Sequence, residues 1–222
     1  CMKWQTVKEI AVYSSLTCVQ QSVMNFGILM VQGLINSFGV AVMAAFAAAV
    51  KIDSFAYMPV QDFGNAFSTF IAQNFGAGQM KRIRDGIRVA VISATLFCIF
   101  ISLVVFGFAR PLMLIFVPAH ETVIISIGIQ YLRIEGAFYC GIGCLFLLYG
   151  FYRGIRKPGM SVVLTVISLG TRVALAYTLS AIPAVGVAGI WWSIPIGWFL
   201  ADVVGVWYYR KGIYIRIYGK VR

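Results

Sequence analysis

The stretch IRVAVISATLFCIFISLVVFGFA, residues 87–109, carries a single charged side chain, Arg88, near its start. About 20 mostly apolar residues are enough for a helix to cross a bilayer. Five further stretches have the same character, so six spans are predicted, at about 11–38, 54–75, 87–109, 122–151, 159–180 and 186–208. The composition agrees, because 61% apolar residues, 11% charged residues and a mean hydropathy of +0.89 lie outside the range of soluble domains. The sequence therefore predicts an all-α fold, a polytopic bundle of six transmembrane helices that forms one domain over residues 1–222.

The basic residues between the spans predict how the bundle is oriented. The formal net charge is +11, and 14 of the 18 Lys and Arg residues fall before the first span, on alternate connections or at their edge (Arg88), or after the last span. Cytoplasmic loops of membrane proteins carry an excess of Lys and Arg, so both termini are expected in the cytoplasm. The membrane is expected to be the cell's inner (plasma) membrane. The same placement argues against nucleic acid as a partner and favours contact with the lipid bilayer.

A series of amides lies within the first span. Gln21, Asn25, Gln32 and Asn36 recur at intervals of four, seven and four, so they line one stripe of a helix. Buried amides are costly in hydrocarbon unless they are paired, so the stripe is expected to face other helices or a water-filled cavity.

The second span contains a carboxylate. Asp53 and Ser54 are interpreted as its N-cap, after a separate Ala-rich segment over residues 40–50. Asp62 would then lie roughly 13 Å along the helix, one turn from Pro59, which is expected to kink it. Ionised groups are rare within spans and are usually functional, so Asp62 is a candidate site for a cation.

Further charges lie in the later spans. Glu135 is in the fourth span, Arg172 is in the fifth and Asp202 is in the last. Opposite charges on separate helices predict interhelical pairs, with Arg172 opposite either Glu135 or Asp62. The cysteines have the spacing of packing residues, and no nucleophile–base pair, metal spacing or phosphate loop is present, so the expected protein is neither an enzyme nor a cofactor binder.

Several short motifs resemble the multidrug and toxic compound extrusion (MATE) transporters. They run through nearly the whole chain, and the most specific is QNFGAG. The motifs are VQGLINSFG at 31–39, KID at 51–53, QNFGAG at 73–78, QYLRI at 130–134, GFYRG at 150–154 and Arg172 in the next span.

The resemblance implies a fold and an activity. Family members look like two six-helix lobes around a V-shaped cavity, and they exchange a drug-like organic cation for Na⁺ or H⁺. By this resemblance the chain is one lobe of a 6+6 transporter, with motifs closer to the C-terminal lobe, and it needs a missing N-terminal lobe or a second copy. The family's acid on the first helix is replaced here by an amide, Gln20 or Gln21, whereas Glu135 matches the acid on the fourth helix. The coupling ion, Na⁺ or H⁺, is then expected at Asp62 or Glu135.

Two other functions remain open at the level of sequence. A flippase for lipid-linked precursors in the same superfamily would need an arginine-lined cavity for pyrophosphate, and only Arg133 and Arg172 lie within spans. A membrane scaffold without transport activity would leave the intramembrane charges unexplained, since each costs several kcal/mol on insertion.

Overall fold

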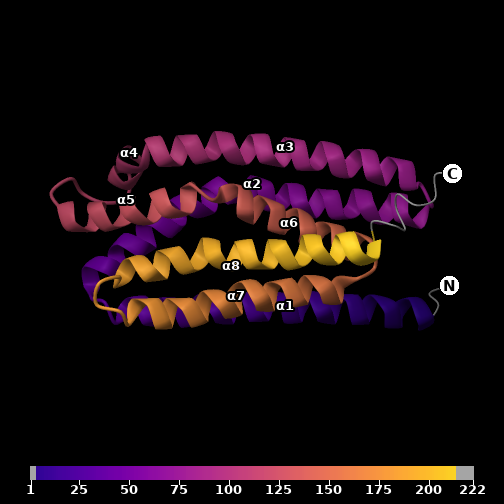
Figure 1. Ribbon diagram of the computed structural model, residues 1–222, viewed down its shortest axis with the longest axis horizontal. Helices are drawn as coiled ribbons and strands as arrows, with labels where there is room; N and C mark the ends of the chain where they lie inside the picture. Colours follow the sequence, from indigo (N-terminus) through magenta and orange to yellow (C-terminus); the bar gives the residue numbers. More distant parts are fainter. Residues whose placement is uncertain (1–3, 214–222) are drawn as a thin grey trace.

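Long helices lie side by side in the computed structural model, which describes residues 4–213 (Figure 1). The described residues contain no strand. The helices are α1 (Trp4–Asn36), α2 (Val40–Gly76), α3 (Met80–Gly107), α4 (Ala109–Leu114), α5 (Thr122–Gly136), α6 (Tyr139–Gly154), α7 (Pro158–Ser180) and α8 (Val187–Tyr208), followed by a π-helical turn, η1 (Tyr209–Ile213).

The described residues contain five or six candidate spans. Five helices are long and apolar enough to cross a membrane, and α5 and α6, bent by 53° at their junction, give the predicted sixth when they are counted as one span. Helices α7 and α8 match the predicted spans to within a residue or two, whereas α3 begins seven residues before the predicted start. Helix α4 occupies part of the connection expected after the third span.

Helix α2 corrects the predicted start of the second span. The Ala-rich segment and the span form one continuous helix of 37 residues, which begins after Gly39, a residue with a φ of 97°. Asp53 is therefore not an N-cap, because it lies in the helix interior, and the Ser54 hydroxyl donates to the Val50 carbonyl one turn before it. The helix continues because its alanines favour helix and present a small, apolar face to the bundle.

The fourth span, predicted as one stretch over residues 122–151, is broken in the structure. Helices α5 and α6 meet at an angle of 53° around Ala137 and Phe138. The last turn of α5 closes when the backbone N–H of Phe138 donates to the Glu135 carbonyl, and the backbone of Gly141 then bonds to Phe138. The glycines on either side, Gly136 and Gly143, carry little helix propensity, so the break falls in the weakest part of the span.

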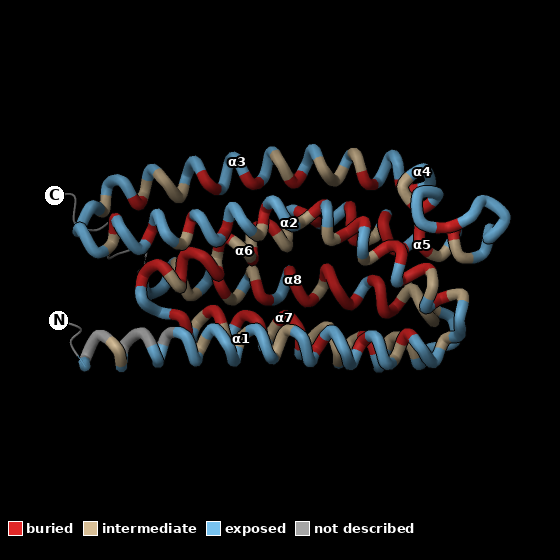
Figure 2. Tube along the Cα trace, turned by 180° about the vertical axis from the view of Figure 1, so that it is seen from behind, coloured by how far each residue is buried: buried red, intermediate tan, exposed pale blue. Residues whose placement is uncertain are grey.

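The core lies between α2, α6 and α8, where buried residues face one another (Figure 2). Three glycines bring α2 and α6 close together. A Cβ atom built on Gly150 would lie 2.3 Å from the Gly64 carbonyl oxygen, and one on Gly154 would lie 2.9 Å from the Ser68 carbonyl oxygen. Glycines four residues apart allow two membrane helices to approach this closely. Lipid supplies no hydrophobic force between helices, so their association depends on such close van der Waals contact.

The outer helix α3 presents a wide apolar surface, as expected for a helix that faces lipid. Most of its large aliphatic and aromatic side chains away from α2 and α6 are exposed (Figure 2). Helix α1 begins and α8 ends at the same end of the bundle (Figure 1). The basic connections after α2 and after α6 lie at that end too, as an even number of crossings requires.

Candidate functional site

A polar cavity of about 170 Å³ lies in the middle of the bundle. Helices α1, α2, α5, α6, α7 and α8 all contribute to its wall. Its polar and charged lining residues are Gln32, Asp53, Tyr57, Gln61, Tyr131, Glu135, Tyr149, Thr165, Ser168 and Arg172.

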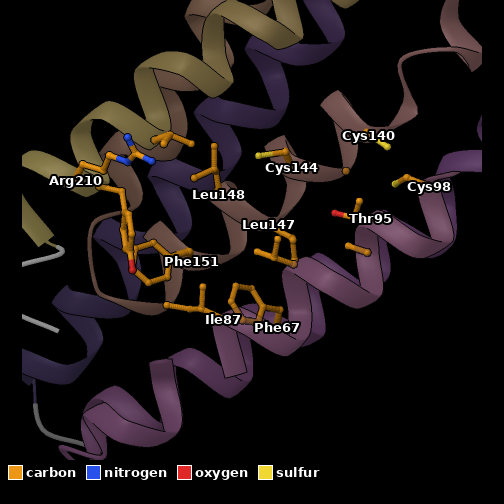
Figure 3. Close-up of a pocket in the computed structure, with 15 residues that line it drawn as sticks. Phe67, Ile87, Thr95, Cys98, Cys140, Cys144, Leu147, Leu148, Phe151 and Arg210 are labelled. Carbon is orange, nitrogen blue, oxygen red and sulfur yellow. The ribbon is translucent and has the colours of Figure 1, made fainter. Parts of the chain in front are cut away.

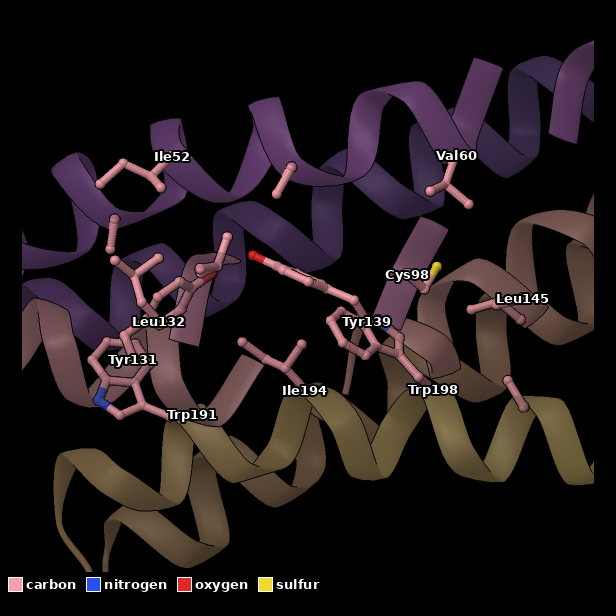
Figure 4. Close-up of a cluster of buried hydrophobic side chains, with 14 of the residues drawn as sticks. Ile52, Val60, Cys98, Tyr131, Leu132, Tyr139, Leu145, Trp191, Ile194 and Trp198 are labelled. Carbon is pink, nitrogen blue, oxygen red and sulfur yellow. The ribbon is translucent and has the colours of Figure 1, made fainter. Parts of the chain in front are cut away.

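Asp53 is held by two tyrosines in this cavity. Its side chain is only 5% exposed. The hydroxyl of Tyr139 donates to Oδ1 at 2.6 Å, and the hydroxyl of Tyr131 donates to Oδ2 at 3.4 Å. Figure 4 shows the Tyr139 ring reaching across from the start of α6 toward α2. The tyrosines fix the carboxyl group in place and replace part of the hydration that it loses in the bundle.

Glu135 lies beside Asp53. It is 1% exposed, its Oε1 atom has no hydrogen-bond partner, and its side chain interacts directly with that of Asp53. Arg172, on α7, acts electrostatically on both carboxyl groups, and its Nε atom also has no hydrogen-bond partner. Two carboxyl groups therefore share one guanidinium. When both acids are ionised, the net charge of Asp53, Glu135 and Arg172 together is −1.

This imbalance determines what the cavity can bind. Neighbouring buried carboxylates cannot easily both be ionised, so the pair favours taking up a proton or a cation. Carboxyl and phenol oxygens are ligands that hard cations accept. Aromatic rings, including those of Tyr57, Phe46 and Trp198, form part of the wall and could stack on a flat organic cation.

The predicted acids have different positions. Glu135 shares the cavity with Arg172, although no direct ion pair joins these two residues in the described structure. Asp62 lies on an exposed face of α2, away from this cavity. Of the two predicted partners of Arg172, the structure therefore brings Glu135 close to it.

The amide stripe lies on an outer face of α1. Gln21, Asn25, Gln32 and Asn36 are all exposed, and Gln32 also reaches the edge of the polar cavity. The neighbouring Gln20 turns inward and donates to the Thr165 hydroxyl at 3.0 Å.

Sequence reasoning missed Asp53 and its two tyrosines. An N-cap assignment placed Asp53 at a helix end, where it would be solvated. A helical periodicity could have revealed it, because Ala49, Asp53, Ala56 and Val60 follow one face of α2 at spacings of three or four residues, and all four are buried. The tyrosines could not be found in this way, since they lie on other helices, 78 and 86 residues further along the chain.

Comparison with known proteins gives the family. The MatE family model matches residues 16–178, most of the chain. The chain belongs to the MatE family. This MatE chain is 27% identical to the probable multidrug resistance protein YpnP of Bacillus subtilis over 95% of its length and 46% of the relative's. It is 26% identical to the probable multidrug resistance protein NorM of Thermotoga maritima over 91% of its length and 42% of the relative's.

Solved MATE structures share the fold. A MATE transporter in complex with MaL6 superposes with a TM-score of 0.89 at 20% identity, over 99% of this chain and 48% of that one. A MOP superfamily transporter from Pyrococcus furiosus superposes with a TM-score of 0.86 at 21% identity, over 98% of this chain and 48% of that one. The MatE chain spans about half the length of the relatives it matches, so it has the fold of one lobe of a two-lobed transporter.

Proposed function

We propose that this chain is the C-terminal lobe of a cation-coupled multidrug efflux antiporter. It exports organic cations by alternating access in exchange for Na⁺ or H⁺, and a missing N-terminal lobe or a second copy completes its cavity. We propose further that it resides in the plasma membrane with both termini in the cytoplasm, the arrangement that its basic connections favour.

The single observation that carries this proposal is the pair of buried carboxyl groups, Asp53 and Glu135, beside the half-buried Arg172. A pair of carboxyl groups with one cationic partner can hold a proton, a Na⁺ ion or an organic cation, but not two of these at once. Competition for this pair would couple entry of the ion to release of the substrate. A non-transporting scaffold has no use for such a group.

A second lobe is supported by the outer face of α1. The four exposed amides Gln21, Asn25, Gln32 and Asn36 would be poorly solvated by lipid, whereas a second lobe would enclose them in a polar cavity. Asp62, which is exposed on α2, remains a second candidate for the coupling cation on the same grounds. The alternative of a pyrophosphate flippase receives less support, because Arg133 lies over the Phe106 ring and only Arg172 lines the cavity.

Neutral replacements of the acids test the proposal in the complete transporter. Glu135→Gln and Asp53→Asn are expected to abolish ion-driven drug uptake into inverted vesicles, while leaving the amount of protein in the membrane unchanged. Asp62→Asn tests the second candidate. Glu121→Gln, in an exposed loop, is the matched control and is expected to transport normally.

Wild-type drug resistance and ion-coupled transport in the Asp53→Asn/Glu135→Gln double variant would show that these carboxyl groups are only structural partners of Arg172. If Asp62→Asn alone stopped transport, the coupling site would lie on the exposed face of α2 instead.

A further inference from the structure

A second cavity, of about 370 Å³, lies between α3, α6, the end of α8 and the turn η1 (Figure 3). Its size is within the range of pockets that bind small ligands, about 300–1,000 Å³. Apart from Thr95, Tyr209 and Arg210, its wall is made of aliphatic, aromatic, glycine and cysteine residues. None of the acids of the polar cavity contributes to it, so it is separate from the proposed transport site.

The surroundings of this cavity are those of a lipid-facing surface. Val91 belongs to its wall and is 48% exposed, and next to it on α3 the side chains of Val89, Ile92 and Leu96 are exposed as well. Water is poorly accommodated in such an apolar hollow, whereas a hydrocarbon chain from the adjoining bilayer can fill it.

The cavity is elongated along the bundle. Arg210 and Ile87 lie toward one end in Figure 3, and Thr95 and Cys98 lie toward the other. Ile87 and Cys98 are separated by eleven residues of α3, which corresponds to about 16 Å along the helix axis. This length is close to half of the roughly 30 Å hydrocarbon core, the depth that one leaflet occupies.

Arg210, the one cation that the described residues contribute to the wall, lies where a lipid headgroup would be. Arg210 is exposed at the end of the bundle where α1 begins and α8 ends. The Nζ atom of the neighbouring Lys211 lies over the Trp207 ring, 4.9 Å from its centroid. Tryptophan and lysine side chains are typical of the interface between membrane and water. A guanidinium pairs well with a phosphate group, and an anionic lipid gains a further attraction from the basic residues at this end.

We propose that this cavity is a binding site for one acyl chain of an anionic phospholipid, whose phosphate group is bound by Arg210. The acyl chain lies between α3 and α6 and reaches the region of Cys98. The bound lipid thus serves as a structural ligand of the lobe, filling a hollow that its own side chains leave open.

Native mass spectrometry of the detergent-extracted full chain tests this proposal, with phosphatidylglycerol and phosphatidylcholine as the probes. The wild-type protein is expected to retain one phosphatidylglycerol. Val91→Trp places an indole in the cavity and should lower the retained lipid at least fivefold. Val89→Trp is the matched control, because Val89 lies on the same exposed helix but outside the cavity, and it should retain lipid as the wild type does.

The headgroup contact is tested separately. Arg210→Gln should reduce the preference for phosphatidylglycerol over phosphatidylcholine at least fivefold, because it removes a direct guanidinium–phosphate contact in addition to a surface charge. Lys211→Gln, in the same turn but outside the cavity wall, removes a surface charge alone and should reduce the preference clearly less.

Equal lipid retention by the Val91→Trp and Val89→Trp variants would overturn the proposal. Displacement of the bound lipid by a transported organic cation would also overturn it, because the cavity would then be a substrate site. An unchanged headgroup preference in Arg210→Gln would refute the role of that residue.

Discussion

Replacing Gly150 with alanine tests how closely α2 and α6 approach each other. The new Cβ atom would lie 2.3 Å from the Gly64 carbonyl oxygen and 3.4 Å from the Ser68 backbone nitrogen. Carbon and oxygen atoms in close contact are normally about 3.3–3.6 Å apart, so the helices must separate by roughly 1 Å. The nearest atom belongs to the backbone of α2, which cannot rotate away as a side chain could.

The cost of this separation can be bounded. Overpacking of a tight interface typically costs about 1–3 kcal/mol, and alanine returns up to about 1 kcal/mol through its higher helix propensity. Because the 2.3 Å contact is with backbone, the overpacking cost is expected in the upper part of that range, about 2–3 kcal/mol, which leaves a net loss of about 1–2 kcal/mol. Such a loss should lower the melting temperature of the detergent-solubilised protein by several degrees, since about 1 kcal/mol corresponds to roughly 2–4 °C for a chain of this size.

Gly170 provides the control. It lies on α7, and no atom comes within 4 Å of a Cβ built on it. Gly170→Ala should therefore leave the melting temperature unchanged or raise it slightly. If the Gly150→Ala and Gly170→Ala variants have the same melting temperature, the close contact of α2 and α6 at Gly150 does not limit their packing.

Two hydrogen bonds give further predictions with the same melting assay. Tyr139→Phe removes the 2.6 Å bond to Asp53 and should cost about 1.5–3 kcal/mol, whereas Tyr131→Phe, which removes a bond of 3.4 Å, should cost less. Equal losses would contradict the assignment of Tyr139 as the main partner. Tyr152→Phe leaves the Gly205 carbonyl without the hydroxyl that donates to it at 2.6 Å, so a loss of about 1–3 kcal/mol is expected. A melting temperature equal to that of the wild type would show that this bond adds nothing to the contact between α6 and α8.

The spans could be predicted from the sequence because their signal is local. Residues 159–180 and 186–208 are mostly apolar, with one charged side chain each, and α7 and α8 follow them closely. The position of the break near Ala137 was not predicted, because α5 and α6 together are apolar enough to be counted as one span. The glycines after Glu135 weaken the helix there, but they do not specify the residue at which the chain bends.

The site could be predicted only in part. Glu135 and Arg172 stood out because ionisable residues are rare within apolar spans, and the structure brings them to one cavity. Asp53 did not stand out, since its place next to Ser54 resembled a helix start. Its partners Tyr131 and Tyr139 are 78 and 86 residues away in sequence, so no local pattern could connect them to it.

The break between α5 and α6 also gives the polar cavity a permanent electric field. A helix carries about half a positive charge at its N-terminus and half a negative charge at its C-terminus. Helix α5 ends at Gly136, directly after Glu135, and its negative pole thus favours a cation there. Helix α6 begins at Tyr139, whose hydroxyl holds Asp53, and its positive pole favours a negative charge on that side. A straight helix would have carried both poles to the membrane surfaces, whereas the bent span keeps two of them inside the bundle.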